Sequence, residues 1–135
     1  MLNIAIDGPS GAGKSTIAKE IAKRLNIIYL DTGAMYRAIG LKAVRLGIDT
    51  NDADGVISFL DNTQIKIEYN DGVQIIYLDG EDVSKAIREH HISKAASNVS
   101  KIPAVRLKLV AMQREIASKN NVVLDGRDIT SYVLK

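Results

Sequence analysis

Cysteine and tryptophan are absent from this 135-residue chain, and phenylalanine occurs once. The lack of cysteine excludes disulfides and thiolate metal sites. Although 46% of the residues are hydrophobic, no apolar run approaches the roughly 20 residues that a membrane span needs. Five tyrosines and one phenylalanine are not spaced as a platform for stacking bases. These absences leave an ordinary folded domain, and we expect no membrane partner.

The chain also lacks a large excess of one charge, because it contains 18 Lys and Arg residues and 16 Asp and Glu residues, which gives a net charge of +2. This balance gives no case for a nucleic-acid partner or a membrane surface. Any anionic ligand must therefore be held by locally placed cations. The N-terminus carries no basic leader before Asp7, so we expect a cytoplasmic protein. His90 and His91 are the only histidines, and we expect a solvated junction there rather than a metal site.

The first thirty residues have the pattern of a βαβ unit. Residues 4–6 form a short apolar run that ends in a glycine-rich turn, as buried parallel strands do. Ile17, Ile21 and Leu25 then recur at helical spacing between charged residues, which predicts an amphipathic helix covering one face of a sheet. Residues 27–30 predict the second buried strand.

The middle of the chain predicts helices and a hairpin. Thr32 is expected to cap a helix that runs to about Arg45 and stops at Gly47, and a weaker helix is expected near residues 56–60. Alternating apolar residues on both sides of the turn Asn70-Asp71-Gly72 predict an antiparallel hairpin. Two more helices are expected, over residues 92–101 and from Pro103 onward, the latter with one apolar stripe: Val105, Leu109, Met112 and Ile116.

One segment fits the phosphate-loop pattern G-x-x-x-x-G-K-[ST] at every position. It consists of Gly8, Pro9, Ser10, Gly11, Ala12, Gly13, Lys14 and Ser15. Glycines let successive backbone N–H groups turn inward around a phosphate, and the following helix points its positive end at the anion. The lysine reaches the β- and γ-phosphates, and the serine hydroxyl ligates Mg²⁺. This loop, with Thr16, is therefore predicted to bind ATP.

Acidic and basic residues follow the predicted strands. Residues 122–124 form a third apolar strand that ends at Asp125, the pattern of a Walker-B acid that holds Mg²⁺. Arg37 lies in the helix after the second strand, close to the sheet edge where open α/β sheets bind ligands. Arg127 and Asp128 follow the third strand at the same edge, and an arginine there can clamp a phosphate bidentately.

Four segments together, in their order and spacing, closely resemble bacterial cytidylate kinase, and the resemblance covers essentially the whole chain. They are Asp7 to Ser15, Asp31-Thr32-Gly33-Ala34-Met35-Tyr36-Arg37, Gly80-Glu81-Asp82-Val83-Ser84 with Ile87-Arg88, and Asp125-Gly126-Arg127-Asp128. The resemblance implies an α/β fold: a three-layer P-loop kinase with a parallel sheet, incomplete here, and an inserted antiparallel subdomain. Residues 1–33 and 107–135 would form the core, and residues 34–106, with the hairpin at 64–79, would bind the monophosphate.

The resemblance also implies an activity, the transfer of the ATP γ-phosphoryl group to CMP or dCMP with Mg²⁺, by a protein expected to be monomeric. Lys14, Arg37 and Arg127 would be catalytic, and Ser15 and Asp125 would serve the metal. The monophosphate would be bound by Thr32, Arg37, Ser97, Arg106, Arg127 and Asp128. Cytosine offers an amino donor and N3 and O2 acceptors, so a carboxylate suits the donor while Arg106 and Ser97 suit the acceptors.

The chain departs from the family in length. After the third core strand, family members continue with two more parallel strands, an arginine-bearing lid and a segment that packs on adenine. Ile129-Thr130-Ser131 also stands where the family usually has Gly-Thr after Ile or Met. Lid cations stabilise the charge on the moving phosphoryl group. We therefore expect 135 residues alone to turn over weakly or not at all.

Two alternatives stay open on the sequence. One is a nucleotide-binding fragment of such a kinase that catalyses nothing. The other is a different small-molecule P-loop kinase, which the hairpin and the Gly126-Arg127-Asp128 segment disfavour. A regulatory GTPase is disfavoured as well, because the chain contains no Asn-Lys-x-Asp motif for reading guanine.

Overall fold

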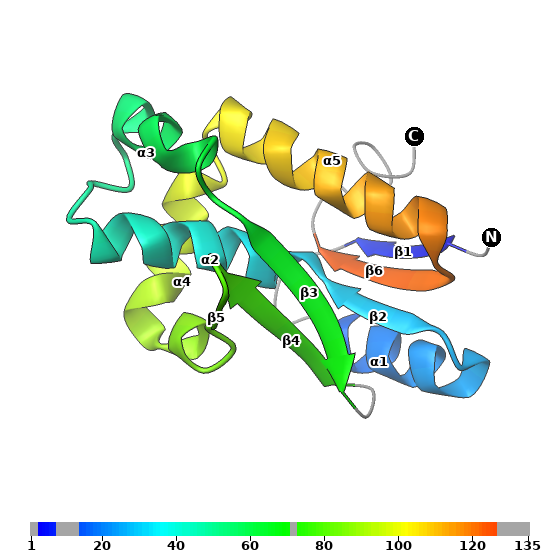
Figure 1. The fold of residues 1–135 in the computed structure, drawn as a ribbon. Coiled ribbons are helices and arrows are strands. Elements are labelled where there is room, and N and C mark those ends of the chain that lie inside the picture. The colour runs from blue at the N-terminus through cyan, green and yellow to red at the C-terminus, as the bar shows by residue number, and fades with distance from the viewer. Residues whose placement is uncertain (1–2, 8–13, 71–72, 127–135) are drawn as a thin grey trace. The chain divides into compact units, whose positions relative to one another are not determined.

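The computed structural model describes residues 3–7, 14–70 and 73–126, with only the backbone at positions 5–7, 14–15 and 125–126. Its elements run β1 (Asn3–Asp7), α1 (Lys14–Leu25), β2 (Ile28–Asp31), α2 (Thr32–Arg45), α3 (Ala53–Leu60), β3 (Ile65–Asn70), β4 (Val73–Leu78), β5 (Glu81–Asp82), the 3₁₀ turn η1 (Ala86–Arg88), α4 (His90–Val99), α5 (Pro103–Lys119) and β6 (Val122–Gly126) (Figure 1). The chain divides into two units, unit 1 (Met1–Thr32 and Val110–Lys135) and unit 2 (Gly33–Leu109).

Unit 1 is built on a parallel sheet with the strand order β1-β6-β2 (Figure 1). The strand that comes last in the sequence, β6, therefore lies between the two that come first. Its residues Val122, Val123 and Leu124 are fully buried, as expected of a central parallel strand with neighbours on both sides. With the separate antiparallel sheet of unit 2, this arrangement confirms the predicted α/β class.

Helix α1 buries a different stripe from the one predicted. Ala18 and Ala22 pack against Val123 of the sheet, with Ile21 partly buried beside them. Ile17 and Leu25 are 54% and 50% exposed, so their assignment to the buried face is wrong. Small alanine side chains let the helix lie close to the strands, and position 17 then falls about 100° around the helix from position 18.

Helix α2 ends as the sequence predicts. Gly47 has φ of 70°, a left-handed conformation that glycine adopts without penalty. The amide of Ile48 donates to the carbonyl of Ala43 at 2.9 Å, and the amide of Gly47 donates to that of Val44 at 3.1 Å. This pair of hydrogen bonds is a Schellman motif, which satisfies carbonyls that would otherwise lack partners at the helix end.

The antiparallel sheet of unit 2 contains the predicted hairpin and one further strand. Strands β3 and β4 pair from Ile65 opposite Leu78 to Asn70 opposite Val73; the predicted turn residues 71–72 lie outside the described residues. The short strand β5 adds to β4 and was not predicted, because two residues carry too little alternation to recognise.

Helices α2 and α4 approach each other closely in unit 2. A Cβ atom added at Gly40 of α2 would lie 3.0 Å from the backbone carbon and the Cβ of Ala95 and from the backbone nitrogen of Ala96 in α4. Met35 and Ile39 of α2 and Ile92 and Val99 of α4 are fully buried. The glycine thus sets the separation of the two helices.

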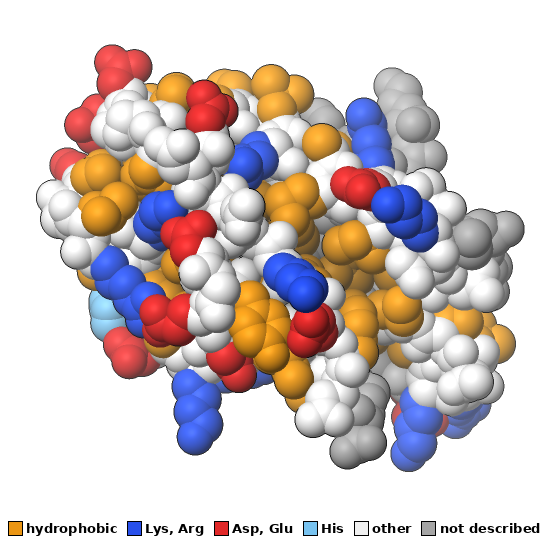
Figure 2. All heavy atoms as spheres, viewed as in Figure 1, with side chains coloured by type: hydrophobic (Ala, Val, Ile, Leu, Met, Phe, Trp, Pro, Cys, Tyr) orange, Lys and Arg blue, Asp and Glu red, His pale blue; other side chains and the backbone are white. Residues whose placement is uncertain are grey.

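Helix α5 buries Val105 and Leu109 as predicted, but the stripe then shifts by one residue. Gln113 (1% exposed) and Ala117 are buried, whereas Met112 and Ile116 are only half-buried. Among the helices within residues 14–70 and 73–126, none is long and apolar enough to cross a membrane. On the face shown in Figure 2, basic and acidic side chains are interspersed, in agreement with the small net charge.

Candidate functional site

At the carboxyl edge of the parallel sheet, Asp125, a predicted metal ligand, lies level with the end of the strand that precedes the phosphate-loop sequence. In register, Asp125 of β6 lies opposite Ile6 of β1 and Asp31 of β2, and Asp7 lies opposite Gly126. Residues 8–13 follow β1 directly, and α1 begins at Lys14. The loop pattern therefore occurs between a strand and a helix, which is the context that this motif requires.

Several predicted residues lie outside what the structure describes. Gly8, Pro9, Ser10, Gly11, Ala12, Gly13, Arg127 and Asp128 are not described, and Lys14, Ser15 and Asp125 are described by their backbone alone. Thr16 lies in the first turn of α1 and is exposed. The roles assigned to these residues remain predictions.

The residue types predicted to hold the metal suit magnesium. Serine has a hydroxyl oxygen and aspartate has carboxylate oxygens, and Mg²⁺ prefers oxygen ligands. Within residues 3–7, 14–70 and 73–126, no group of three or more His, Cys, Asp or Glu side chains gathers as a protein-only metal cage. Mg²⁺ in phosphotransferases characteristically takes one or two protein oxygens and completes its shell with phosphates and water.

Arg37 lies in the second turn of α2, half-buried, and its guanidinium contacts two neutral acceptors. Its Nη1 donates to the backbone carbonyl of Ile87 in η1 at 3.0 Å, and its Nη2 donates to the hydroxyl of Ser93 in α4 at 3.0 Å. Among the described side chains, no carboxylate pairs with it. Its positive charge is therefore fixed in place but not neutralised by that part of the chain.

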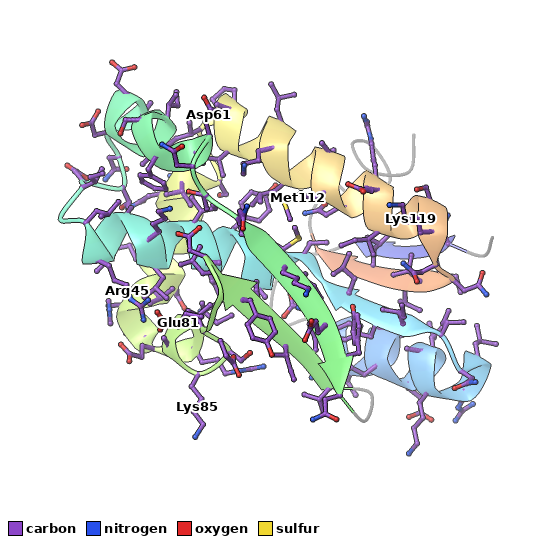
Figure 3. All side chains as sticks on the ribbon, viewed as in Figure 1. Arg45, Asp61, Glu81, Lys85, Met112 and Lys119 are labelled. Atoms are coloured by element: carbon purple, nitrogen blue, oxygen red, sulfur yellow. The ribbon has the colours of Figure 1, made fainter. Side chains whose placement is uncertain are left out.

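The other two cations of α2 are paired with acids. Lys42 Nζ lies 2.6 Å from Asp79 Oδ2. Arg45 bonds Glu81 with both terminal nitrogens, at 2.9 and 3.0 Å, and Figure 3 shows the two side chains meeting. Asp79 also accepts from the amide of Gln64 at 2.8 Å. These contacts attach the antiparallel sheet to the C-terminal half of α2.

Two further predicted residues lie in unit 2 with Arg37. Ser97 is exposed on α4 one turn after Ser93, so both serines share a helix face. Arg106 lies in α5 close enough to Tyr36 to affect its titration: burial raises the pKa of Tyr36 above 10.0, and the charge of Arg106 partly offsets that rise. Thr32 is buried and belongs to unit 1.

The structure also identifies residues that the sequence analysis missed. Ser93 and the carbonyl of Ile87 hold Arg37, and Gly40 lets α4 approach closely enough for that contact. The only sequence feature that pointed to Ser93 was its i, i+4 spacing from Ser97, which places both serines on one helix face. This spacing does not show that Ser93 contacts Arg37, which lies 56 positions earlier in the chain.

Comparison with known proteins agrees with this geometry. The sequence model of the cytidylate kinase family, described as "Cytidylate kinase", matches residues 4–135. A protein named cytidylate kinase from Caldicellulosiruptor saccharolyticus is 54% identical over 133 residues, which is 98% of this chain and 59% of that protein. Its namesakes from Clostridioides difficile and Geobacillus kaustophilus are 53% and 47% identical, with the same coverage.

This chain thus spans about 59% of the length of these curated relatives. The resemblance seen in the four motifs is confirmed, because the family model covers nearly every residue. The phosphate-loop sequence between a strand and a helix, the parallel sheet and the inserted antiparallel sheet agree with that match, and the chain belongs to the cytidylate kinase family.

Proposed function

We propose that this chain binds CMP or dCMP and Mg·ATP and takes part in transferring the ATP γ-phosphoryl group, which yields CDP or dCDP and ADP. The family supports the reaction type. The observation that carries the proposal is Arg37, whose guanidinium is held by a carbonyl and a hydroxyl and not by an acid of the described chain. A fixed cation without a carboxylate partner is suited to binding a phosphate.

In this proposal different residues bind the phosphoryl donor and the acceptor nucleotide. Residues 8–16 wrap the polyphosphate, and Lys14 contacts its β- and γ-oxygens. Ser15 and Asp125 hold the Mg²⁺, which neutralises negative charge on the phosphates. Arg37 and Arg127 bind the phosphate of the monophosphate and keep its oxygen in line with the donor.

The cytosine side of the proposal rests on hydrogen-bond complementarity. Asp128 accepts from the N4 amino group of cytosine, and Arg106 and Ser97 donate to N3 and O2. Thr32 lines the acceptor site. Uracil has no amino group to donate, so Asp128 would face a carbonyl oxygen. A site that leaves a buried polar group unpaired rejects the wrong ligand strongly.

The experiment measures binding and turnover separately on the 135-residue protein. Calorimetric titration with CMP, dCMP, UMP and AMP is expected to rank the cytosine nucleotides first, and a coupled assay for ADP release tests turnover. Lys14→Ala is expected to weaken Mg·ATP binding while leaving CMP affinity unchanged. Asp128→Ala is expected to reduce the preference for CMP over UMP.

The outcomes separate the open alternatives. Binding of CMP and Mg·ATP without ADP release would support the non-catalytic fragment. Preference for AMP would overturn the cytosine assignment, and a folded protein that binds neither ligand would overturn the proposal. The monomeric state, the cytoplasmic location and the lack of a nucleic-acid partner remain predictions of the sequence.

A further inference from the structure

We propose that Ser93, together with the backbone carbonyl of Ile87, positions Arg37 for the phosphate of the bound nucleoside monophosphate. This inference rests on the proposed function, since it assigns Arg37 a phosphate to bind. Ser93 is a positioning residue in it, because it acts through Arg37.

The geometry leaves the guanidinium both fixed and available. A guanidinium has five N–H donors in one plane. Nη1 gives one of its two to Ile87 and Nη2 gives one of its two to Ser93, each at 3.0 Å. As far as the described residues are concerned, Nη1 and Nη2 each keep one N–H without a partner, and Nε keeps its own. Two of these remaining donors suffice for a bidentate contact with phosphate.

Both acceptors are themselves held in place. Ile87 is buried, and its amide donates to the carbonyl of Val83 at 3.0 Å. Ser93 lies on α4, whose contact with α2 is fixed by Gly40. Near the C-terminal end of α4, the Asn98 side chain donates to the hydroxyl of Thr50 at 2.9 Å. The acceptors therefore limit the rotamers that Arg37 can adopt before a ligand arrives.

The neutrality of these acceptors is what makes the arrangement suitable for binding an anion. A carboxylate in the place of Ser93 would compete with phosphate for the same guanidinium. A hydroxyl accepts one hydrogen bond and leaves the net charge of +1 on Arg37. Preorganising a long side chain in this way reduces the conformational entropy lost on binding, so removal of the hydroxyl should lower affinity for the phosphate without changing affinity for the base.

The test titrates the 135-residue protein with CMP and, separately, with cytidine, which lacks the phosphate. Ser93→Ala is expected to weaken CMP binding about 3- to 10-fold, the size of one ordinary hydrogen bond, and to leave cytidine binding unchanged. Ser93→Thr retains a hydroxyl and should restore most of the affinity. Ser58→Ala is the matched control, because the only hydrogen bond of its exposed hydroxyl among the described residues goes to the carbonyl of Gly55 in its own helix.

A double-mutant cycle distinguishes positioning from a general weakening of α4. Arg37→Ala alone should weaken CMP binding, and Ser93→Ala added to it should cause no further loss, because the effect of Ser93 passes through Arg37. Additive losses, or equal losses for CMP and cytidine, would overturn the inference.

The remaining outcomes distinguish a failure of this inference from a failure of the proposed function on which it rests. If Arg37→Ala weakens CMP binding and Ser93→Ala does not, the positioning role is wrong and the proposed function stands. If the natural chain, shown to be folded by circular dichroism, binds CMP no better than cytidine, the proposed role of Arg37 fails and the role of Ser93 fails with it.

Discussion

The two halves of helix α2 use their cations differently. Toward its C-terminus, Lys42 and Arg45 form ion pairs with Asp79 and Glu81 of the antiparallel sheet region. In its second turn, Arg37 bonds a carbonyl and a hydroxyl. All three cations lie on one helix within nine residues, yet only the last two are neutralised by described acids.

This difference identifies which charges stabilise the fold and which one is suited to a ligand. Lys42 and Arg45 lie in the last turn of α2, where the helix dipole favours cations, and each also fastens a segment of the neighbouring sheet. Arg37 has the same charge, but its partners only orient it. The nature of a cation's partner is thus more informative about function than its presence in the sequence.

The largest expected effect contrasts two arginines of this helix. Arg37→Ala should weaken CMP binding roughly 10- to 100-fold, the cost of losing a charge-assisted contact with phosphate. Arg45→Ala should change CMP affinity by less than about twofold, because its guanidinium is occupied by Glu81. Calorimetry on both variants measures this, and equal losses would remove the distinction between the two halves.

Gly40→Ala tests the helix contact that brings Ser93 to Arg37. The added Cβ would meet backbone atoms of Ala95 and Ala96 at 3.0 Å, and backbone cannot move aside as a flexible side chain can. Overpacking of this kind costs about 1–3 kcal/mol, and the better helix propensity of alanine offsets about 1 kcal/mol of that cost. We expect a net loss of up to about 2 kcal/mol in urea unfolding; a variant more stable than the natural chain would contradict the close approach.

Asp79→Asn tests the pairing at the C-terminal half through its pH dependence. Partial burial raises the pKa of Asp79, but hydrogen bonds from Gln64 and Lys42 and the charge of Lys42 lower it more, so it lies below the ordinary 3.8. A lowered carboxyl pKa contributes stability that is present above the unfolded pKa and is lost as pH falls through the folded pKa.

The Asp79→Asn variant keeps an oxygen for the backbone amide of Gln64 and suits the left-handed conformation of this position (φ of 50°). It should be less stable than the natural chain at pH 7 by under about 1 kcal/mol, because the carboxylate is 40% exposed. The difference between the two unfolding free energies should shrink as pH falls below about 4 and disappear once the pH is below the lowered pKa of Asp79. A difference that persists unchanged at pH 2 would show that charge is not its cause.

The smallest expected effect is the coupling between Arg45 and Glu81. Both side chains are largely exposed, so a double-mutant cycle with Arg45→Ala and Glu81→Ala should give about 0.2–1 kcal/mol, decreasing as salt is added. A coupling that is insensitive to salt would mean that the pair acts by packing and would weaken the contrast with Arg37.

Local patterns were sufficient for most elements. Gly47 marked the end of α2 because a left-handed residue is needed there, and the alternation around residues 65–78 identified the hairpin. Sequence patterns gave the wrong answer where tertiary packing determines which residues of an element are buried. Ile17 and Leu25 fit an apolar stripe as well as Ala18 and Ala22 do, and only contact with the sheet reveals which pair is buried.

The family could be recognised from the order and spacing of four short segments, and the phosphate-loop motif, its expected strand and helix, and the arginine at position 37 are local features that the sequence shows directly. The partners of that arginine became known only from the tertiary contacts. Ile87 and Ser93 lie 50 and 56 positions after Arg37 in the chain, so no local periodicity predicts these contacts. The contact with Ser93 follows from the packing of α4 against α2, where Gly40 permits the close approach of the two helices.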